Sequence, residues 1–242
     1  PYYFFVKRDF GLSKKYDKGF GMTELFKLNN VGIVTARDNL TIHDTPAEVI
    51  NTVKDFAYLD VEVARHKYKL GKDVRDWTVA WAQRDLIEAQ ISLEKVTPIN
   101  YRPFDTKYTY YTGNSKGFHC YPRWDTMKHF INRNNLGLLL CKQFKAFPEY
   151  HHVFVCKNCF ESSVVSNKTS EISYGFPLYI YEDLDNSRHP NFNSEIIKKF
   201  ADGLKLKFME EKTAEQDTFA PIDVLDYIYA VLHSPKYRET YK

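Results

Sequence analysis

Two short patterns combine residue types that can support catalysis or hold a metal. Asp105 and Lys107 have the Asp-x-Lys spacing that ends one signature of metal-dependent nucleases. Such a site needs a second carboxylate to share the metal, for which Glu88 and Glu94 are candidates, and a lysine that orients the attacking water. So short a pattern also occurs in ordinary surface strands. A nuclease built on Asp105 and Lys107 is therefore the alternative hypothesis for this chain.

The second pattern is Cys156-Lys157-Asn158-Cys159, which has the spacing of half a zinc site. No second Cys-x-x-Cys follows, and Cys120 and Cys141 stand alone in the sequence. Free cysteine is mostly a small buried hydrophobe, so we interpret this pair as the end of a buried strand and the turn after it, without a metal. Four cysteines in 242 residues do not form a disulfide scaffold, which indicates a reducing, cytoplasmic location.

Other catalytic signatures are absent from the sequence. It contains no glycine-rich phosphate loop, no Gly-x-Ser-x-Gly motif and no His-Glu-x-x-His motif. The Asn/Asp-Pro-Pro-Tyr/Phe tetrapeptide of amino-methyltransferases is missing, as is a glycine-rich loop for S-adenosylmethionine. A histidine without a carboxylate partner is more often structural, so we assign no catalysis to His129, His151 or His152. We expect this chain to be no enzyme and to hold no cofactor.

The stretch from Tyr101 to Tyr111 contains five aromatic residues, one carboxylate and two cations, Arg102 and Lys107. Pro103 disfavours a helix here, and a strand would direct alternate side chains to opposite faces. We expect one face of this strand to pack in a core. The other face would present both cations and the tyrosine hydroxyls to a polyanion.

The net charge of +3 is distributed unevenly along the chain. Residues 101–170 contain ten Lys/Arg against four Asp/Glu, a net charge of +6. A local basic excess is typical of a surface that binds a phosphate backbone, although a solvated surface of ordinary lysines explains it as well. We expect these cations to gather on one groove that holds a duplex.

Several predicted loops carry side chains that are suited to reading DNA. Arg and Lys pair with guanine, Asn and Gln pair with adenine, and Lys, Ser and Thr anchor phosphates. Loops on a rigid scaffold are the usual position of such residues. Each one alone is also explained as a solvated polar side chain, so the prediction depends on the set. The candidate DNA-binding residues are Arg37, Asn39, Arg102, Lys107, Lys116, Arg123, Lys128, His129, Arg133, Lys142, Gln143, Asn167 and Lys168.

The pattern of apolar and capping residues predicts an α+β fold. Thr45-Pro46-Ala47-Glu48 combines an N-cap, a proline at the first helical position and a capping-box glutamate. The predicted helices are 23–28, 45–58, 61–70, 76–89, 125–133, 194–206 and 221–232. The predicted strands are 2–6, 31–35, 136–141, 153–156, 163–166 and 178–181, with a turn or flexible loop at 113–117, a polar linker at 183–193 and a mobile connection at 207–219. We expect a mixed β-sheet core with flanking helices over residues 1–182 and a helical C-terminal appendage over 183–242.

Six stretches carry a resemblance to a known family, in the same order along the chain. They are residues 1–10 (PYYFFVKRDF), 31–38 (VGIVTARD), 99–111 (INYRPFD and YTYY), 122–129 (PR and MKH), 176–181 (FPLYIY) and 227–238 (YIYAVLHSPKYR). Together they resemble the C-terminal target-recognition, or specificity, domain of single-polypeptide restriction–modification enzymes of the type ISP and type IIG classes. The tyrosine-rich strand and Leu232-His233-Ser234-Pro235 are the most specific of these stretches.

The resemblance implies a function in double-stranded DNA recognition. In this family, nuclease and N6-adenine methyltransferase modules, with an ATPase in the ISP class, precede the recognition domain, so S-adenosylmethionine and Mg²⁺ belong to those modules. The base-reading residues vary within the family, and individual contacts do not transfer. We expect a cytoplasmic fragment of a longer polypeptide whose partners are duplex DNA and the methyltransferase module, with no membrane association. A third hypothesis is a protein-interaction platform formed by the C-terminal helices, although their amphipathic faces are better explained by packing on the core of this chain or on the methyltransferase module.

Overall fold

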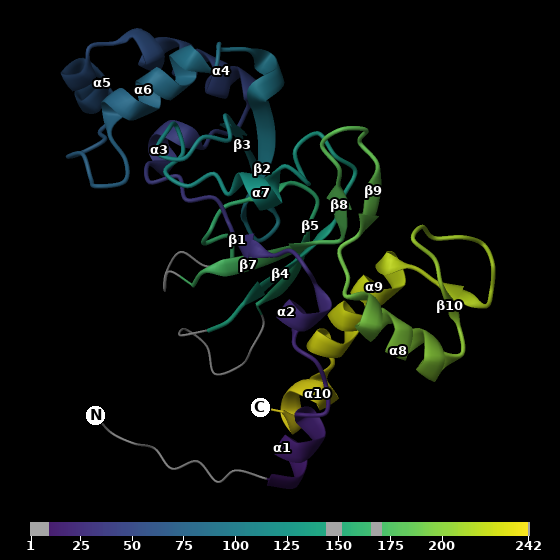
Figure 1. The fold of residues 1–242 in the computed structure, drawn as a ribbon. Coiled ribbons are helices and arrows are strands. Elements are labelled where there is room, and N and C mark those ends of the chain that lie inside the picture. Colours follow the sequence, from purple (N-terminus) through teal and green to yellow (C-terminus); the bar gives the residue numbers. More distant parts are fainter. Residues whose placement is uncertain (1–9, 144–151, 166–170, 242) are drawn as a thin grey trace. The chain divides into compact units, whose positions relative to one another are not determined.

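The structure, a computed structural model, describes residues 10–143, 152–165 and 171–241. These residues form two compact units. The larger unit is Leu28–Pro190, and the smaller unit comprises the described residues before Leu28 together with those after Pro190 (Figure 1). The strand predicted at residues 2–6 lies outside the described residues. Within the described ranges, no helix is both long enough and apolar enough to span a membrane.

Helices and strands carry the labels of Figure 1. The helices are α1 (Phe10–Tyr16), α2 (Met22–Leu25), α3 (Asp38–Thr41), α4 (Pro46–Tyr58), α5 (Val61–Lys67), α6 (Val79–Glu88), α7 (Trp124–Met127), α8 (Ser194–Leu204), α9 (Pro221–His233) and α10 (Pro235–Thr240), with a 3₁₀ turn at Leu93–Lys95. The strands are β1 (Asn30–Val31), β2 (Val96–Arg102), β3 (Asp105–Tyr110), β4 (Gly137–Cys141), β5 (Val153–Cys156), β6 (Cys159–Phe160), β7 (Ser173–Pro177), β8 (Tyr179–Tyr181), β9 (Arg188–Pro190), β10 (Lys207–Phe208) and β11 (Thr218–Phe219).

Helices α4, α5 and α6 form a helical layer in the larger unit (Figure 1). Helix α4 begins as predicted, because the Thr45 hydroxyl accepts from the Glu48 N–H at 3.2 Å and the Glu48 carboxylate accepts from the Thr45 N–H at 2.9 Å. Helix α6 begins at Val79, three residues later than predicted, because Thr78 is its N-cap and accepts from the Trp81 N–H at 3.1 Å. A capping side chain thus fixes each helix start.

Two sheets and a hairpin complete the larger unit. The first sheet has the order β1-β7-β4-β5, with antiparallel neighbours throughout. The second has the order β3-β2-β6, in which β2 pairs with β3 antiparallel and with β6 parallel. Strands β8 and β9 form an antiparallel hairpin. The predicted α+β class with a mixed sheet is therefore confirmed.

The end of β3 contributes to two hydrophobic cores. Tyr110 is buried in the core that α4, α5 and α6 share with Trp77 and Phe118. Tyr111, the next residue, is buried in the core between the sheets, beside residues such as Ile99. Alternation along a strand separates neighbouring side chains in this way, and it leaves both faces of this strand packed.

The predicted presentation of tyrosine hydroxyls to a polyanion is wrong for three tyrosines of this stretch. The Tyr101 hydroxyl donates to an Asp38 carboxylate oxygen at 2.7 Å. The Tyr111 hydroxyl donates to the Pro122 carbonyl at 2.7 Å, and the Tyr110 hydroxyl accepts a backbone N–H at 3.1 Å. These hydroxyls connect neighbouring segments of the fold, because a buried phenol needs a hydrogen-bond partner.

Four local predictions differ from the structure. The described part of the strand predicted at 163–166 is a turn, since the Val164 N–H donates to the Glu161 carbonyl at 3.1 Å. The linker predicted at 183–193 contains β9, and the connection predicted at 207–219 contains the parallel pair β10–β11. Helix α10 follows α9 directly after Ser234, although the sequence predicted only one helix there.

The smaller unit is built from α1, α2, α8, α9 and α10 around aromatic contacts. Phe26 and Phe192 meet edge to face with ring centroids 5.0 Å apart. Asn193 caps α8 by accepting the Glu195 N–H at 3.0 Å, and Pro221 occupies the first position of α9. The C-terminal helices are confirmed, while the division of the chain at residue 182 stays a prediction.

Candidate nucleic-acid interface

Three segments of the larger unit bring four cations around Cys120. The antiparallel bridge between Val34 and Tyr121 joins the segment before Arg37 to the segment that contains Arg123. Its two backbone hydrogen bonds measure 2.9 and 3.1 Å. The Cys120 thiol donates to the Asp76 carbonyl at 3.2 Å, which attaches the loop between α5 and α6 to the same place. We call the group Arg37, Arg75, Lys116 and Arg123 the cation cluster.

The electrostatics of Cys120 show that these charges act on one region. Burial, and then the charge of Asp76, raises the pKa of the Cys120 thiol, whereas Arg123, Arg37 and Lys116 lower it. Arg75 is the nearest cation to Asp76, and its hydrogen bond is the main cause of the lowered pKa of that carboxyl. The cluster therefore combines four cations with the carboxylate of Asp76, while Asp73 also acts on Arg37, which leaves an excess of positive charge on a small area.

Arg37 contributes charge to the cluster, but its guanidinium is already engaged. Its Nε–H donates to the Leu70 carbonyl at 2.7 Å and its Nη2 donates to the Lys72 carbonyl at 2.9 Å. The guanidinium also lies over the Trp77 ring, 4.9 Å from the centroid. These contacts fix the loop after α5, so the guanidinium of Arg37 has a structural role. None of the described ion pairs includes Arg37, so no carboxylate bonded to it neutralises its charge.

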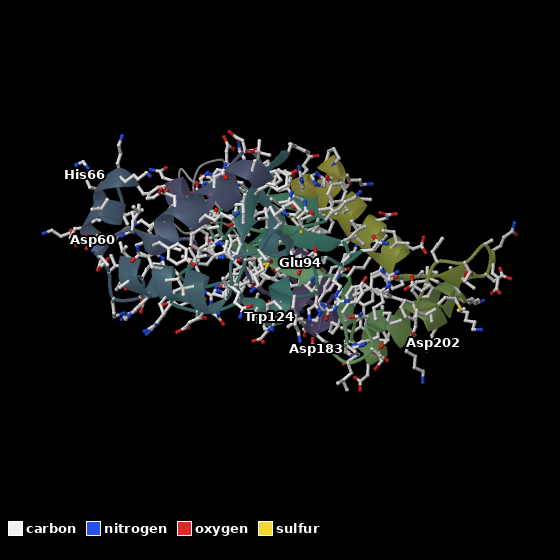
Figure 2. All side chains as sticks on the ribbon, turned by 90° about the horizontal axis from the view of Figure 1, so that it is seen from above. Asp60, His66, Glu94, Trp124, Asp183 and Asp202 are labelled. Atoms are coloured by element: carbon white, nitrogen blue, oxygen red, sulfur yellow. The ribbon has the colours of Figure 1, made fainter. Side chains whose placement is uncertain are left out.

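The half-buried Arg123 and the exposed Trp124 form an edge of the cluster. Arg123 adopts a left-handed backbone conformation (φ 59°), its guanidinium lies 4.9 Å from the Tyr121 centroid, and its buried Nε has no hydrogen-bond partner among the described residues. Trp124, which is labelled in Figure 2, is 48% exposed and stacks on Tyr111 with ring centroids 6.2 Å apart. A cation beside an aromatic face is an arrangement that suits nucleic-acid binding.

Lys116 and Arg75 are the most solvent-facing members of the cluster. The Lys116 ammonium lies 5.7 Å from the Trp81 ring centroid, and the residue is exposed. The Arg75 side chain is 90% exposed and pairs with Asp76 at 2.8 Å. An exposed ion pair contributes little stability, so this arginine can exchange its carboxylate for a phosphate at small cost.

The structure assigns Arg102 and Lys107 to ion pairs. Arg102 lies 2.8 Å from Glu161 and 3.8 Å from Asp38. Lys107 pairs with Asp44 and lies 3.7 Å from Asp105. Acidic residues distant in sequence already neutralise both cations in the free chain, and the expectation that this strand presents them to a polyanion stays a prediction.

The predicted residues of the 128–133 segment also bond within the chain. The Lys128 ammonium lies 2.8 Å from Asp183. His129 is buried, and its Nδ1 accepts the Tyr181 N–H at 3.1 Å. Burial lowers the pKa of His129 to about 4. Arg133 donates to the Asn186 side chain at 2.6 Å. This group joins α7 and the following turn to the β8–β9 hairpin.

The remaining predicted residues lie at separate places. Lys142 and Gln143 are exposed directly after β4, with the Lys142 ammonium 4.2 Å from the Tyr174 ring centroid. Asn39 is exposed at a hollow of about 250 Å³ whose lining includes three carboxylates, an unfavourable place for phosphate. Asn167 and Lys168 lie outside the described residues. The described cations of residues 101–170 therefore have different local partners, and their gathering on one groove stays a prediction.

The geometry does not favour the nuclease alternative. Lys107 lies between Asp44 and Asp105, so its ammonium occupies the space between the two carboxylates. Among residues 10–143, 152–165 and 171–241, no group of three or more His, Cys, Asp or Glu is arranged to hold a metal. Cys156 and Cys159 are buried free thiols, and burial raises the pKa of each.

Two contributors to this surface were missed from the sequence. Arg75 was assigned no role, because a single arginine before a predicted helix gives no signal of its own. Asp85 lies inside the predicted helix 76–89 and has no predicted role, yet its side chain is buried and accepts hydrogen bonds from the segment that carries Lys116. Its only sequence signal is a charged residue on the apolar face of α6.

Residues 24–242 match the family model of the Type ISP C-terminal specificity domain. No curated protein matches the sequence. Three solved structures are similar in fold. The cryoEM structure of a DrdV–DNA complex has a TM-score of 0.58 and 21% identity, over 89% of this chain and 20% of that chain.

The other two structures carry Type ISP enzymes in their descriptions. A nuclease-deletion mutant of the Type ISP restriction–modification enzyme LlaGI, in complex with a DNA substrate mimic, has a TM-score of 0.53 and 19% identity, over 92% of this chain and 19% of that chain. The ATP-dependent Type ISP enzyme LlaBIII, bound to DNA, has a TM-score of 0.60 and 15% identity, over 91% of this chain and 14% of that chain. The chain thus spans a fifth or less of the length of these three proteins.

Proposed function

Because the chain belongs to the family of Type ISP C-terminal specificity domains, we propose that it recognises one sequence in double-stranded DNA. In doing so it positions a separate adenine methyltransferase or nuclease module of a longer polypeptide. The family match over residues 24–242 is the observation that carries this proposal. The fold shared with three DNA-bound proteins supports it.

The cation cluster supplies the surface on which this recognition depends. Arg75 is suited to a phosphate contact because its side chain is 90% exposed, whereas Arg123 is half-buried and adds its charge beside the exposed Trp124. The charge of Arg37 adds to the local field from its fixed position. Phosphate contacts set the position of a protein on the duplex, and base contacts set its specificity.

The experiment is selection from a random pool of duplex DNA with the 242-residue chain. We expect enrichment of one asymmetric motif and an affinity that falls steeply as salt concentration rises. Folding is verified first by circular dichroism and a cooperative thermal transition. Enrichment of no motif by the folded chain, at low salt, would refute the proposal.

Variants of the cluster test the surface itself. Arg75→Ala and Arg123→Gln should each weaken binding to all sequences alike and reduce the slope of log affinity against log salt by about 0.9. Lys54→Ala is the matched control, because Lys54 is an exposed lysine on α4 outside the cluster. If Arg75→Ala and Arg123→Gln change DNA affinity no more than Lys54→Ala does, the cation cluster does not contact DNA.

We further propose that the C-terminal helical segment, residues 183–242, packs against the methyltransferase module of the same polypeptide. The smaller unit has an apolar hollow of about 420 Å³, whose lining includes Phe200, Leu204, Phe219 and Tyr227. Exposed apolar surface of this kind often marks a contact with another domain. Leu204→Glu in the full-length polypeptide should lower methylation while DNA binding by the 242-residue chain stays unchanged, and equal methylation would contradict this docking.

A further inference from the structure

A buried carboxylate holds the loop that carries Lys116. Asp85 lies on α6 and is 5% exposed. One of its carboxylate oxygens accepts the Thr112 hydroxyl at 2.8 Å and the Phe118 N–H at 2.7 Å, and the other accepts the Asn114 side-chain amide at 2.8 Å. Three donors from one loop thus satisfy one carboxylate, and no described cation forms an ion pair with it.

Two glycines allow the loop to lie this close to its supports. A Cβ on Gly117 would lie 2.2 Å from the Asp85 carboxylate, so only glycine fits there. Gly113 has a φ of +83°, and a Cβ on it would lie 3.0 Å from the Trp124 ring. The segment Gly113–Gly117, which we call the pinned loop, is therefore held by Asp85 on one side and Trp124 on the other. The sequence alone had predicted a flexible turn here.

The tip of the pinned loop is polar, exposed and fixed in direction. Asn114, Ser115 and Lys116 are all exposed. Lys116 adopts a left-handed conformation (φ 57°), and its N–H donates to the Cys120 carbonyl at 3.0 Å. Trp81, one helical turn before Asp85 on α6, lies beneath the lysine ammonium. The backbone of the tip is thus ordered before any ligand arrives.

We propose that the pinned loop enters a groove of the duplex and reads base edges, with Lys116 as the main reader and Asp85 as its positioning residue. The proposal rests on the function proposed above. Lysine donates to the O6 and N7 acceptors of guanine, and serine contacts several bases. Because the loop is ordered in advance, binding does not require the entropy cost of fixing it. The neighbouring cations would meanwhile hold the phosphates.

The test compares the motifs that variants select from a random duplex pool. Lys116→Ala should relax the preference at one guanine position, with discrimination reduced about 5- to 100-fold, while the other positions keep theirs. Thr112→Val, which removes one donor to Asp85, should relax the same position although Lys116 is present. Thr112→Ser keeps the hydroxyl and should restore the wild-type motif. Lys54→Ala should leave the motif unchanged.

The outcomes distinguish this inference from the function on which it rests. If the wild-type chain enriches no motif, the proposed function itself fails. If the wild type enriches a motif but Lys116→Ala weakens binding to all sequences equally, the lysine contacts phosphate and the reading role is overturned. If Lys116→Ala keeps the wild-type motif and the wild-type affinity, the pinned loop lies outside the interface and the proposal is overturned. Thermal unfolding of Thr112→Val is measured alongside its motif selection. If this variant loses both the motif and the fold, the positioning role of Asp85 is overturned.

Discussion

Substitution of Arg102 by alanine should weaken the fold and leave DNA recognition unchanged. The side chains of Arg102 and Glu161 are 19% and 7% exposed, and their ion pair measures 2.8 Å. Removing one partner of a buried pair costs about 3–5 kcal/mol, because the other charge stays buried without compensation. Glu161 keeps two donors, the Ser162 hydroxyl at 2.8 Å and the Ser163 N–H at 2.9 Å. We therefore expect a cost of about 2–3 kcal/mol, at or somewhat below the lower end of that range.

The assay is thermal unfolding followed by circular dichroism at pH 7. For a chain of this size each kcal/mol corresponds to about 2–4 °C in Tm, so Arg102→Ala should lower Tm by about 5–10 °C. The double variant Arg102→Met/Glu161→Gln removes both charges and should recover part of the loss. DNA affinity, measured well below the lowered Tm, should equal that of the wild type.

The pH dependence gives an independent check on the same ion pair. Burial is the main cause of the raised pKa of Glu161, and Arg102 opposes it. Without Arg102 the pKa of Glu161 rises further, and the folded state then binds a proton that the unfolded state releases. Protonation of Glu161 stabilises the folded state of the variant. This stabilisation is complete below the pKa of Glu161 in the unfolded chain, near 4.3, and is lost as pH rises through the higher pKa of Glu161 in the folded chain. The loss of unfolding free energy caused by Arg102→Ala should therefore be smallest near pH 4. A variant that binds DNA more weakly but keeps the wild-type Tm would refute this structural role of Arg102.

Three further predictions use local contacts. Thr45→Ala removes the N-cap of α4 and should lower the free energy of unfolding by about 1 kcal/mol in denaturant titrations, with Thr45→Ser close to wild type. Burial lowers the pKa of His119 to about 3. The contribution of the neutral His119 to the free energy of unfolding is therefore complete above pH 6.5 and should decrease toward pH 3 by up to about 1.4 kcal/mol per pH unit. His119→Gln should make the free energy of unfolding depend less on pH in this range. Lys128→Ala breaks a pair whose Asp183 partner is 72% exposed and should change the free energy of unfolding by less than about 1 kcal/mol; a larger loss would show that this pair is structural.

Sequence reasoning succeeded where the signals were local. The start of α4 follows from Thr45, Pro46 and Glu48, which lie within four residues and form the cap that their order implies. The predicted helix 76–89 begins three residues before α6 does. In the structure Asp76 pairs with Arg75, while Thr78 supplies the cap.

Sequence reasoning failed where a side chain finds its partner far along the chain. Glu161 lies 59 residues from Arg102, and Asp44 lies 63 residues from Lys107. A sequence shows the cation and gives no sign of the carboxylate that will neutralise it. Asp85 is the converse case, a carboxylate whose partners lie 27 to 33 residues later in a loop that looked flexible. The composition therefore predicted a basic region, but which charges remain available for a partner depends on tertiary contacts.

This division of the charges has a measurable consequence for the proposed DNA interface. If the ten cations of residues 101–170 all met phosphates, log affinity would fall against log salt with a slope of about −9. The structure neutralises Arg102, Lys107 and Lys128 with carboxylates. The cation cluster has four members, which limits its share of the slope to about −3.6. A slope near −9 would therefore mean that cations outside the cluster also meet phosphates, whereas a slope of about −3.6 or shallower would agree with binding through the cluster.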